Sequence, residues 1–516
     1  MTTSNSQTTS SSTAEASGDL VPDGRLRLVS TDVPVLVGFT LLYGVQVTHA
    51  AVTRAFWLDE LFTFYIVTMP DWAGMFDLIR RGPDQNPPLF YVVTRLLVGC
   101  FGESEWAFRL PAIGGYWLLC LSLYILGRRL GGGSASGLVA MATPLVTGVV
   151  FYASEARPYG LMLGCFGLGL VCYHLTGDAS LPPDRRRSAL LGLGGGLSLG
   201  MAFHYMMLLP LTCLWLVELY RTQRTRQHRW AVWAALLAPL GVLAYNWPLF
   251  IEQAQIPYWK TTLRWSELPD FYWWLINPPA CLALLTLLAV IVLRNWQEPR
   301  TAARSVWFQK DLAPEWPAMG VVSIFVFPIG WMVLMQITGK TMFTQRYLLP
   351  AVVGLSIWLV YVTRRLTARN AQRLAVGVWV ILATSTLWVS LQPWRLVPPS
   401  TEEVVNLPNP SQPVIVSVLE YLPLKHYFGS RLPQVVYVFG VLSYPQPQDP
   451  ERGLRALLRN PRTPRFEDKS FLQRYNRLYV VCHKVYGADS LIPLFKRRNV
   501  PIVRETANYF VYDYAY

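Results

Sequence analysis

Long uninterrupted apolar runs constrain the fold of this chain more than any other feature. Runs of about 20 residues, the length that a helix needs to cross the hydrocarbon of a bilayer, recur through most of the 516 residues. Charged residues form 15% of the chain, against about 25% in a soluble domain, and the mean hydropathy is +0.29. The sequence therefore predicts an α-helical polytopic membrane protein.

The runs divide the chain into three parts. Residues 1–30 are rich in Ser and Thr and contain no apolar core, so we expect a disordered tail. This tail lacks the basic start and apolar stretch of a cleaved signal peptide, so the first run should stay as an anchor. Residues 31–392 form the membrane domain, and 393–516 form a separate C-terminal domain. About eleven transmembrane helices are predicted, at 33–52, 109–127, 134–152, 158–176, 188–204, 205–220, 230–251, 272–293, 318–338, 347–363 and 373–391.

Basic loops set the expected orientation. The formal net charge is +14, and its basic residues cluster in five loops between apolar runs, which makes nucleic-acid binding a poor explanation of the charge. The run "PPLFYVVTRLLVGCFG", from Pro87, is short for a span and contains Arg95. If it lies along the membrane surface, all five basic loops fall on one side, as the positive-inside rule requires. We therefore expect interfacial helices in a first outer loop, 53–108, and a cytoplasmic N-terminus in the inner (plasma) membrane.

The C-terminal region has a different pattern. "PVIVSVLEYL", "QVVYVFG", "RLYVVCHKV" and "YFVYDYAY" are typical of short strands, and "PERGLRALLRN" is typical of an amphipathic helix. This pattern predicts a small extracytoplasmic α/β domain. Cys482 is its single cysteine, so the domain cannot form an internal disulfide, and no cysteine spacing in the chain indicates a metal site.

Two adjacent carboxylates, Asp59 and Glu60, stand inside the apolar stretch "FWLDELFTFY". A carboxylate is expensive to desolvate unless something compensates. Successive side chains on a helix point about 100° apart, so the two do not form a facing pair. We expect one of them to face a cavity while the other caps a helix or pairs elsewhere.

The predicted topology collects further polar residues on the same outer face. Charged residues at a membrane edge are functional candidates by default. Arg157 and Arg346 have the alternative of interfacial snorkelling, and His204 and Tyr205 that of ordinary turn residues. The candidates are Glu155, Arg157, His204, Tyr205, Lys340, Gln345 and Arg346.

Several motifs, in their order and spacing, resemble one known family. These are "WLDELFTF", "NPPLFYVV", "GESEWAFRLPAIGGYWLLCLSLYILGRRLGG", "SEARPYGLML", "HYMMLLP" and "QRYLLP". The chain resembles the bacterial branch of the protein O-mannosyltransferase and aminoarabinose-transferase superfamily, membrane glycosyltransferases of the C-type fold. The resemblance is strong over residues 33–220, fainter to about 391 and absent from the C-terminal region.

The resemblance implies a reaction. Such enzymes move a hexosyl or pentosyl group, generally with inversion, from a polyprenyl-phosphate carrier to a glycan, lipid or protein acceptor outside the cytoplasm. An acidic residue of the first outer loop acts as base; it matches Asp59, with Glu60 beside it. Cations stabilise the leaving phosphate, and Arg157 and Arg346 suit this role best, followed by Lys340. The first loop lacks a clear Asp-x-Asp, so no metal is predicted, although the oligosaccharyl-transferase relatives do use one.

Two other classes stay open. A transporter or flippase of a lipid-linked sugar would also need interfacial cations and an apolar groove, but it would show internal repeats or broken helices at mid-membrane. A catalytically dead scaffold is the third class.

Overall fold

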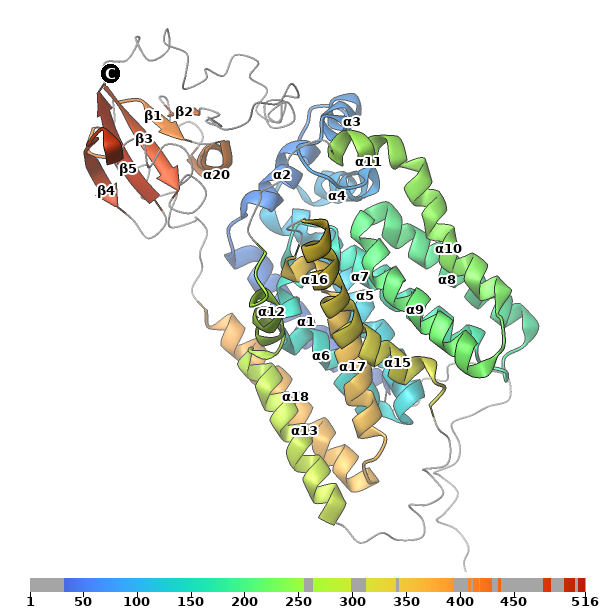
Figure 1. Cartoon of the computed structure of the whole chain (residues 1–516). Helices are drawn as coiled ribbons and strands as arrows, with labels where there is room; N and C mark the ends of the chain where they lie inside the picture. The colour runs from blue at the N-terminus through green and yellow to red at the C-terminus, as the bar shows by residue number, and fades with distance from the viewer. Residues whose placement is uncertain are drawn as a thin grey trace, which may run out of the picture.

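The computed structural model describes residues 32–254, 263–297, 312–339, 343–392, 407–409, 412–416, 418–428, 435–437, 477–483, 496–505 and 509–515. These residues form a long helical bundle and a small α/β domain at one end of it (Figure 1). The tail 1–30, Lys340 and the helix expected at "PERGLRALLRN" lie outside the described residues. The boundary at 392–393 also stays a prediction.

The bundle contains the long helices. Their bounds are α1 (Asp32–Thr53), α5 (Glu105–Gly131), α6 (Ser134–Val146), α7 (Tyr159–Thr176), α8 (Pro183–Phe203), α9 (Leu208–Thr225), α10 (Trp230–Tyr245), α13 (Pro279–Gln297), α15 (Glu315–Val321), α16 (Phe327–Thr338), α17 (Pro350–Thr363) and α18 (Ala368–Ser390). A π-helical turn, η3 (Val322–Val326), joins α15 to α16. Each of the eleven predicted spans overlaps at least one of these helices.

Among the described residues, six helices are long and apolar enough to cross a membrane, or up to eight if each bent pair is one span. One bent pair joins α6 to the 3₁₀-helix η1 (Gly148–Ser154) at 77°, and the other joins α10 to α11 (Trp247–Ala254) at 60°. The remaining three predicted spans fall on α8, α9 and α17. The chain is thus a multi-pass membrane protein, while the count of eleven stays a prediction.

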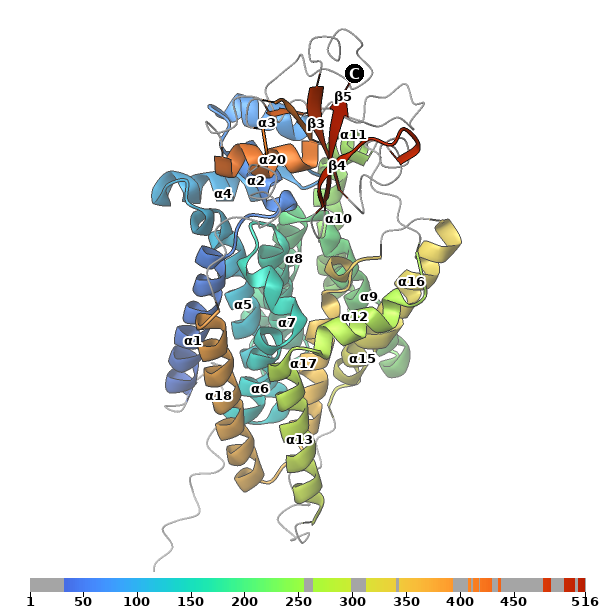
Figure 2. The ribbon, with the colours of Figure 1, turned by 90° about the vertical axis from the view of Figure 1, so that its left-hand side faces the viewer.

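The predicted span 272–293 is wrong in its first part. Helix α12 (Glu267–Ile276) ends before Pro278, and α13 begins at Pro279. Proline lacks the N–H that a continuing helix needs, and its ring crowds the preceding turn. The Pro-Pro pair therefore separates α12 from the bundle helix that follows (Figure 2).

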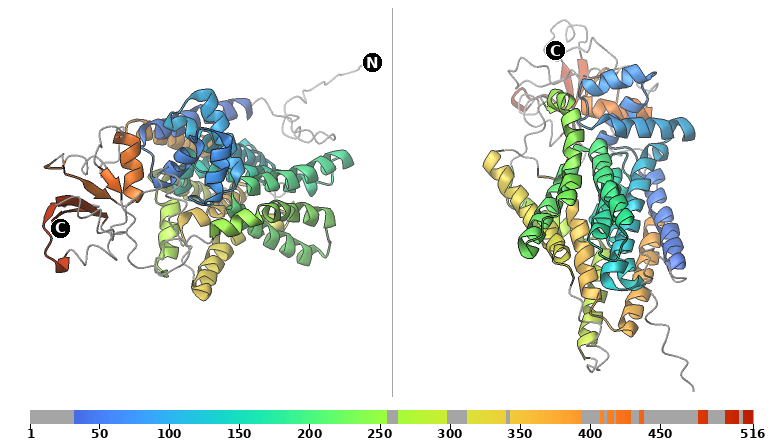
Figure 3. Two further views of the ribbon diagram at one scale, coloured as in Figure 1. Left: turned by 90° about the horizontal axis from the view of Figure 1, so that it is seen from above. Right: turned by 90° about the vertical axis from the view of Figure 1, so that its right-hand side faces the viewer.

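Three helices of the first loop lie across the end of the bundle. They are α2 (Leu58–Val67), α3 (Trp72–Arg80) and α4 (Pro88–Phe101). Figures 2 and 3 show α3 and α4 running crosswise to the bundle helices, as predicted for an interfacial arrangement. Helix α3 buries Met75, Leu78 and Ile79 but exposes Trp72 and Phe76, the amphipathic pattern of a helix at a membrane surface.

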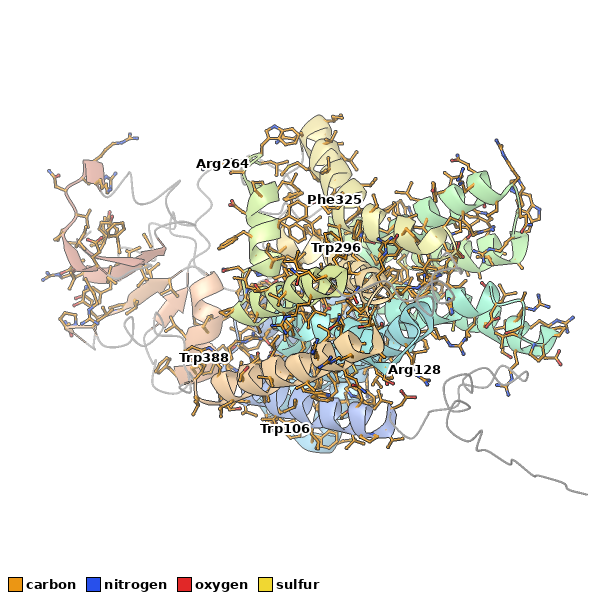
Figure 4. The ribbon with its side chains drawn as sticks, turned by 90° about the horizontal axis from the view of Figure 1, so that it is seen from below. Trp106, Arg128, Arg264, Trp296, Phe325 and Trp388 are labelled. Carbon is orange, nitrogen blue, oxygen red and sulfur yellow. The ribbon has the colours of Figure 1, made fainter. Side chains whose placement is uncertain are left out.

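Large apolar side chains cover the outside of the bundle. A soluble protein seldom exposes contiguous apolar surface, whereas a bilayer covers such a surface favourably. Three of these residues, labelled in Figure 4, are Trp296 of α13, Phe325 of η3 and Trp388 of α18, and they are 75%, 48% and 69% exposed.

Helices α5 and α7 pack backbone against backbone. A Cβ on Gly160 would lie 2.3 Å from the carbonyl oxygen of Ala112, and one on Gly164 would lie 2.3 Å from that of Gly115. Small residues at such contacts let membrane helices approach closely. The contact fixes Arg109, at the start of α5, relative to Glu155 and Arg157, which come just before α7.

The C-terminal domain has five described strands and one described helix. The bounds are β1 (Val414–Val416), α20 (Val418–Phe428), β2 (Val435–Tyr437), β3 (Arg477–His483), β4 (Ile502–Glu505) and β5 (Tyr509–Ala515). The sheet order is β2-β1-β3-β5-β4. The pairs β1–β2 and β1–β3 are parallel, while β5 pairs antiparallel with β3 and β4. In register, Ile415 lies opposite Val436 and Val480, and Val480 opposite Tyr512.

The strand expected over "PVIVSVLEYL" is only partly correct. Its β part is limited to β1, and residues 418–422 belong to α20, which packs against α2. Tertiary contacts often override the local preference of a short apolar run. The other three expected strands are β2, β3 and β5, and β4 is an additional strand.

Candidate active site

Asp59 and Arg346 meet although 287 positions separate them. Asp59 lies in the first turn of α2, and Arg346 lies in the 3₁₀-helix η4 (Gln345–Tyr347), between α16 and α17. Arg346 Nη1 donates a 2.7 Å hydrogen bond to Asp59 Oδ2. Both side chains keep some exposure, 17% for Asp59 and 33% for Arg346. A carboxylate and a guanidinium therefore stand together where the first loop meets the bundle.

Glu60 is placed quite differently from its neighbour. Its side chain is fully buried and forms a two-bond ion pair with Arg109, at 2.7 Å to Oε1 and 2.8 Å to Oε2. Oε1 also accepts from the Ala156 amide at 2.7 Å. Glu60 thus pairs inside the protein while Asp59 is the partly exposed member of the two. Its predicted catalytic role stays a prediction, and these contacts favour a positioning role.

A cavity of about 440 Å³ opens beside Arg346. Its wall comes from the start of α2, from η1, from α7, from α12 and from the segment 343–346. The wall contains aromatic and acidic side chains and the guanidinium of Arg346. The lining residues are Trp57, Phe151, Tyr152, Glu155, Tyr159, Glu267, Asp270, Phe271, Phe343, Thr344, Gln345 and Arg346. Three predicted residues, Glu155, Gln345 and Arg346, therefore share one cavity.

Glu155 brings an unpaired carboxyl group to this cavity. It lies in the connection between η1 and α7 and is fully buried. Neither carboxyl oxygen has a hydrogen-bond partner among the described residues. Burial raises the pKa of Glu155 to about 8, helped by nearby Glu60 and opposed in part by Arg157 and Arg54. An acid with a pKa near neutrality, aimed into a cavity, is a typical feature of an active site.

Arg157 is already paired, with Asp84 of the first loop. Its Nη1 contacts Asp84 Oδ2, and its Nη2 donates to Asp84 Oδ1 at 2.9 Å. Nη1 also donates to the backbone carbonyl of Asp59 at 3.1 Å. Burial opposes ionisation of Asp84, but Arg157 outweighs it and holds the pKa of that carboxyl below its usual range. This geometry favours a positioning role for Arg157, and phosphate binding by it stays a prediction.

His204 and Tyr205 lie nearby but not in the cavity wall. His204 Nδ1 accepts from the Met206 amide at 3.3 Å, and its ring packs 4.9 Å from that of Tyr159. The Tyr205 ring packs 5.2 Å from Phe250. Within the described part of the chain, His204 Nε2 and the Tyr205 hydroxyl have no partner. Both residues lie in the connection between α8 and α9, which includes η2 (Tyr205–Met207).

The sequence interpretation missed Asp84, Arg109 and the acidic residues of α12. Arg109 carried a usable signal, since a cation at the edge of a predicted span needs a partner. Asp84 stands in the Gly- and Pro-rich stretch "GPDQNPP", which gives no hint of its partner. Glu267 and Asp270 reach the cavity because α12 separates from α13, which the span prediction concealed.

Within the described ranges, no group of three or more His, Cys, Asp or Glu side chains could hold a metal ion. Metal-independent chemistry nonetheless stays a prediction, because this finding concerns the protein side chains alone.

Comparisons with known proteins give a fold but no sequence family. No protein-family model matches the chain, and no curated protein matches it. Among solved structures, the chain is similar to ArnT from Cupriavidus metallidurans in the apo state, with a TM-score of 0.57 and 12% identity. It is also similar to ArnT from the same organism bound to undecaprenyl phosphate, with a TM-score of 0.55 and 14% identity. Each match covers 94% of this chain and 98% of the other. Over nearly its whole length, the chain therefore has the C-type membrane fold of ArnT.

Proposed function

We propose that this protein is a glycosyltransferase that moves a sugar from a polyprenyl-phosphate carrier to an acceptor outside the cytoplasm. The observation that carries the proposal is the Asp59–Arg346 pair beside the acidic and aromatic cavity. The fold of ArnT, which has been solved with undecaprenyl phosphate bound, supports a lipid-linked donor. The orientation, with the cavity end outside, rests on the basic loops at the other end of the bundle.

The proposed chemistry divides the work between the two partners. As the acceptor hydroxyl attacks the anomeric carbon, its proton moves to the Asp59 carboxylate, and the carbon–oxygen bond to the phosphate breaks. Such proton acceptance typically contributes about 10²–10⁴ in rate. Negative charge collects on the departing lipid phosphate, where the Arg346 guanidinium can stabilise it. The aromatic wall suits the apolar face of a sugar ring, and the membrane-surface helices lie where the carrier headgroup arrives.

A release assay tests this function. Purified protein in lipid nanodiscs is incubated with a panel of radiolabelled polyprenyl-phosphate sugars and candidate acceptors. Appearance of free polyprenyl phosphate, with label on an acceptor, supports the transferase. Movement of intact donor between leaflets of vesicles without release of carrier would show a flippase instead.

Arg346→Ala is expected to lower kcat by about 10²-fold, the usual loss for one donor at a developing oxyanion. Arg346→Lys should be intermediate, because lysine keeps the charge but not the planar fork. The effect falls on kcat because the contact tightens as the phosphate gains charge. Steady-state kinetics of carrier release measure both variants. Unchanged turnover in both would mean that Arg346 does not stabilise the leaving phosphate.

The pH dependence of kcat/KM should report the ionisation of the Glu155 carboxyl. With a pKa of about 8, this carboxyl is neutral at pH 7 and ionises above pH 8, where it would repel the donor phosphate. We expect kcat/KM to fall about tenfold between pH 7 and 9, since this ratio reports groups of the free enzyme. Glu155→Gln stays neutral and should flatten the alkaline limb. A profile of Glu155→Gln that still falls in the same way would assign the limb to another group.

A further inference from the structure

Helix α20 of the C-terminal domain lies against α2, the helix that carries Asp59 (Figure 1). The His426 ring packs 4.5 Å from Phe64 and 5.6 Å from Phe56. The Tyr65 hydroxyl donates to the backbone carbonyl of Leu422 at 3.2 Å. A helix of 10 residues such as α2 has little stability of its own, so its place depends on neighbours of this kind.

The hydroxyl of Tyr427 occupies a special position in this contact. It accepts a 2.6 Å hydrogen bond from the backbone amide of Phe56, in the turn between α1 and α2. It donates a 2.6 Å hydrogen bond to Glu105 Oε1, at the start of α5. Phe56 is only 1% exposed, and a buried amide without a partner is strongly unfavourable. One side chain of the C-terminal domain thus provides the hydrogen-bond acceptor for the backbone amide just before α2.

Arg109 carries the contact onward to the site. Its Nη1 lies 3.7 Å from Glu105 Oε2, and donates to the carbonyls of Ala51 at 2.5 Å and Arg54 at 2.7 Å. Its other nitrogens hold Glu60, the residue next to Asp59. The Arg109 guanidinium therefore links the end of α1, the start of α2 and the start of α5. Tyr427 contacts the same region through Phe56 and Glu105.

We propose that Tyr427 is a positioning residue, through which the C-terminal domain sets the start of α2 and hence the place of the Asp59 carboxylate. This inference rests on the proposed function, and it explains why a domain without cavity-lining residues among those described contacts the first loop. A small displacement of a reacting group lowers rate more than affinity. The contact therefore acts on the rate of transfer.

Tyr427→Phe tests the proposal, because it keeps the ring and removes only the two hydrogen bonds. The assay uses the polyprenyl-phosphate sugar that the wild-type protein accepts as donor. We expect kcat to fall about tenfold and KM for the donor to stay nearly unchanged. Hydrogen exchange should rise in peptides that cover residues 54–60, where the Phe56 amide has lost its acceptor. Binding of undecaprenyl phosphate should match the wild-type protein.

Tyr65→Phe is the matched control. It removes the hydroxyl contact of α2 with the Leu422 carbonyl of α20 and leaves the Tyr427 hydrogen bonds to Phe56 and Glu105 in place, so kcat and exchange at 54–60 should stay near wild type. Equal losses in both variants would show general docking and overturn a specific role of Tyr427. Wild-type kcat and exchange in Tyr427→Phe would also overturn it. A wild-type protein that releases no carrier from any donor would instead refute the proposed function, while the exchange result would still report on the corner.

Discussion

Asp59→Asn is expected to reduce turnover by about 10²–10⁴-fold, the usual contribution of a positioned base. The amide has almost the volume of the carboxylate, and its oxygen can still accept the 2.7 Å hydrogen bond from Arg346. It cannot take the proton of the acceptor hydroxyl. Single-turnover release of carrier measures the loss, while binding of undecaprenyl phosphate and the melting temperature should stay close to wild type.

Asp77→Asn is a suitable control for this experiment. Asp77 belongs to the same loop, pairs with Arg81 on the surface and is 61% exposed, so its variant should turn over normally. Full turnover in Asp59→Asn, together with loss in a well-folded Glu60→Gln, would exchange the roles of the two acids. Normal turnover in both variants would remove the basis for the transferase.

Glu60→Gln should act on stability rather than on proton transfer. Both Glu60 and Arg109 are fully buried, and removing one partner of a buried ion pair costs about 3–5 kcal/mol because the other charge is left uncompensated. We expect a large fall in melting temperature and in the yield of folded protein. The fraction that folds should lose about tenfold in kcat, the loss of a positioning contact, and far less than Asp59→Asn. Thermal unfolding in detergent, monitored alongside turnover per folded molecule, separates the two effects.

The double variant Glu60→Gln/Arg109→Met sharpens this test. In the double variant neither Glu60 nor Arg109 is left as a buried charge without its partner. The double variant should therefore lose less stability than the sum of the single variants. Glu103→Gln provides the control, since Glu103 is an exposed acid of the same loop. A Glu60→Gln protein as stable as the wild type would contradict the structural role of the pair.

The sequence predicted the membrane bundle well because apolar length is a strong and local signal. Every predicted span falls on a helix, and the charge argument correctly laid α4 along the end of the bundle. Local pattern failed where tertiary contacts decide the outcome. The Pro-Pro break hid α12, and the contact with α2 turned the end of a predicted strand into α20.

The candidate site was only partly predictable for a similar reason. Asp59 attracts attention because an acid among aromatics is unusual, and adjacency indicated that Asp59 and Glu60 would point in different directions. Partner choice has no local signal. Nothing near Arg346 in the chain indicates that it meets Asp59, and nothing near Arg157 that it meets Asp84. Such pairs follow from the way the first loop packs against the segments that precede α7 and α17.

The distance along the chain between Asp59 and Arg346 has a consequence for biosynthesis. A ribosome that adds about 5–20 residues per second needs roughly 15–60 s to make the 287 positions between them. Tyr427, the hydrogen-bond acceptor of the Phe56 amide, follows Phe56 by 371 positions and is made later still. Until Arg346 is made, α2 lacks the cation that pairs with Asp59, and until Tyr427 is made, the Phe56 amide lacks its acceptor. The proposed active site is therefore complete only after synthesis has passed Tyr427, and chains that stop after α18 would lack the support of α20.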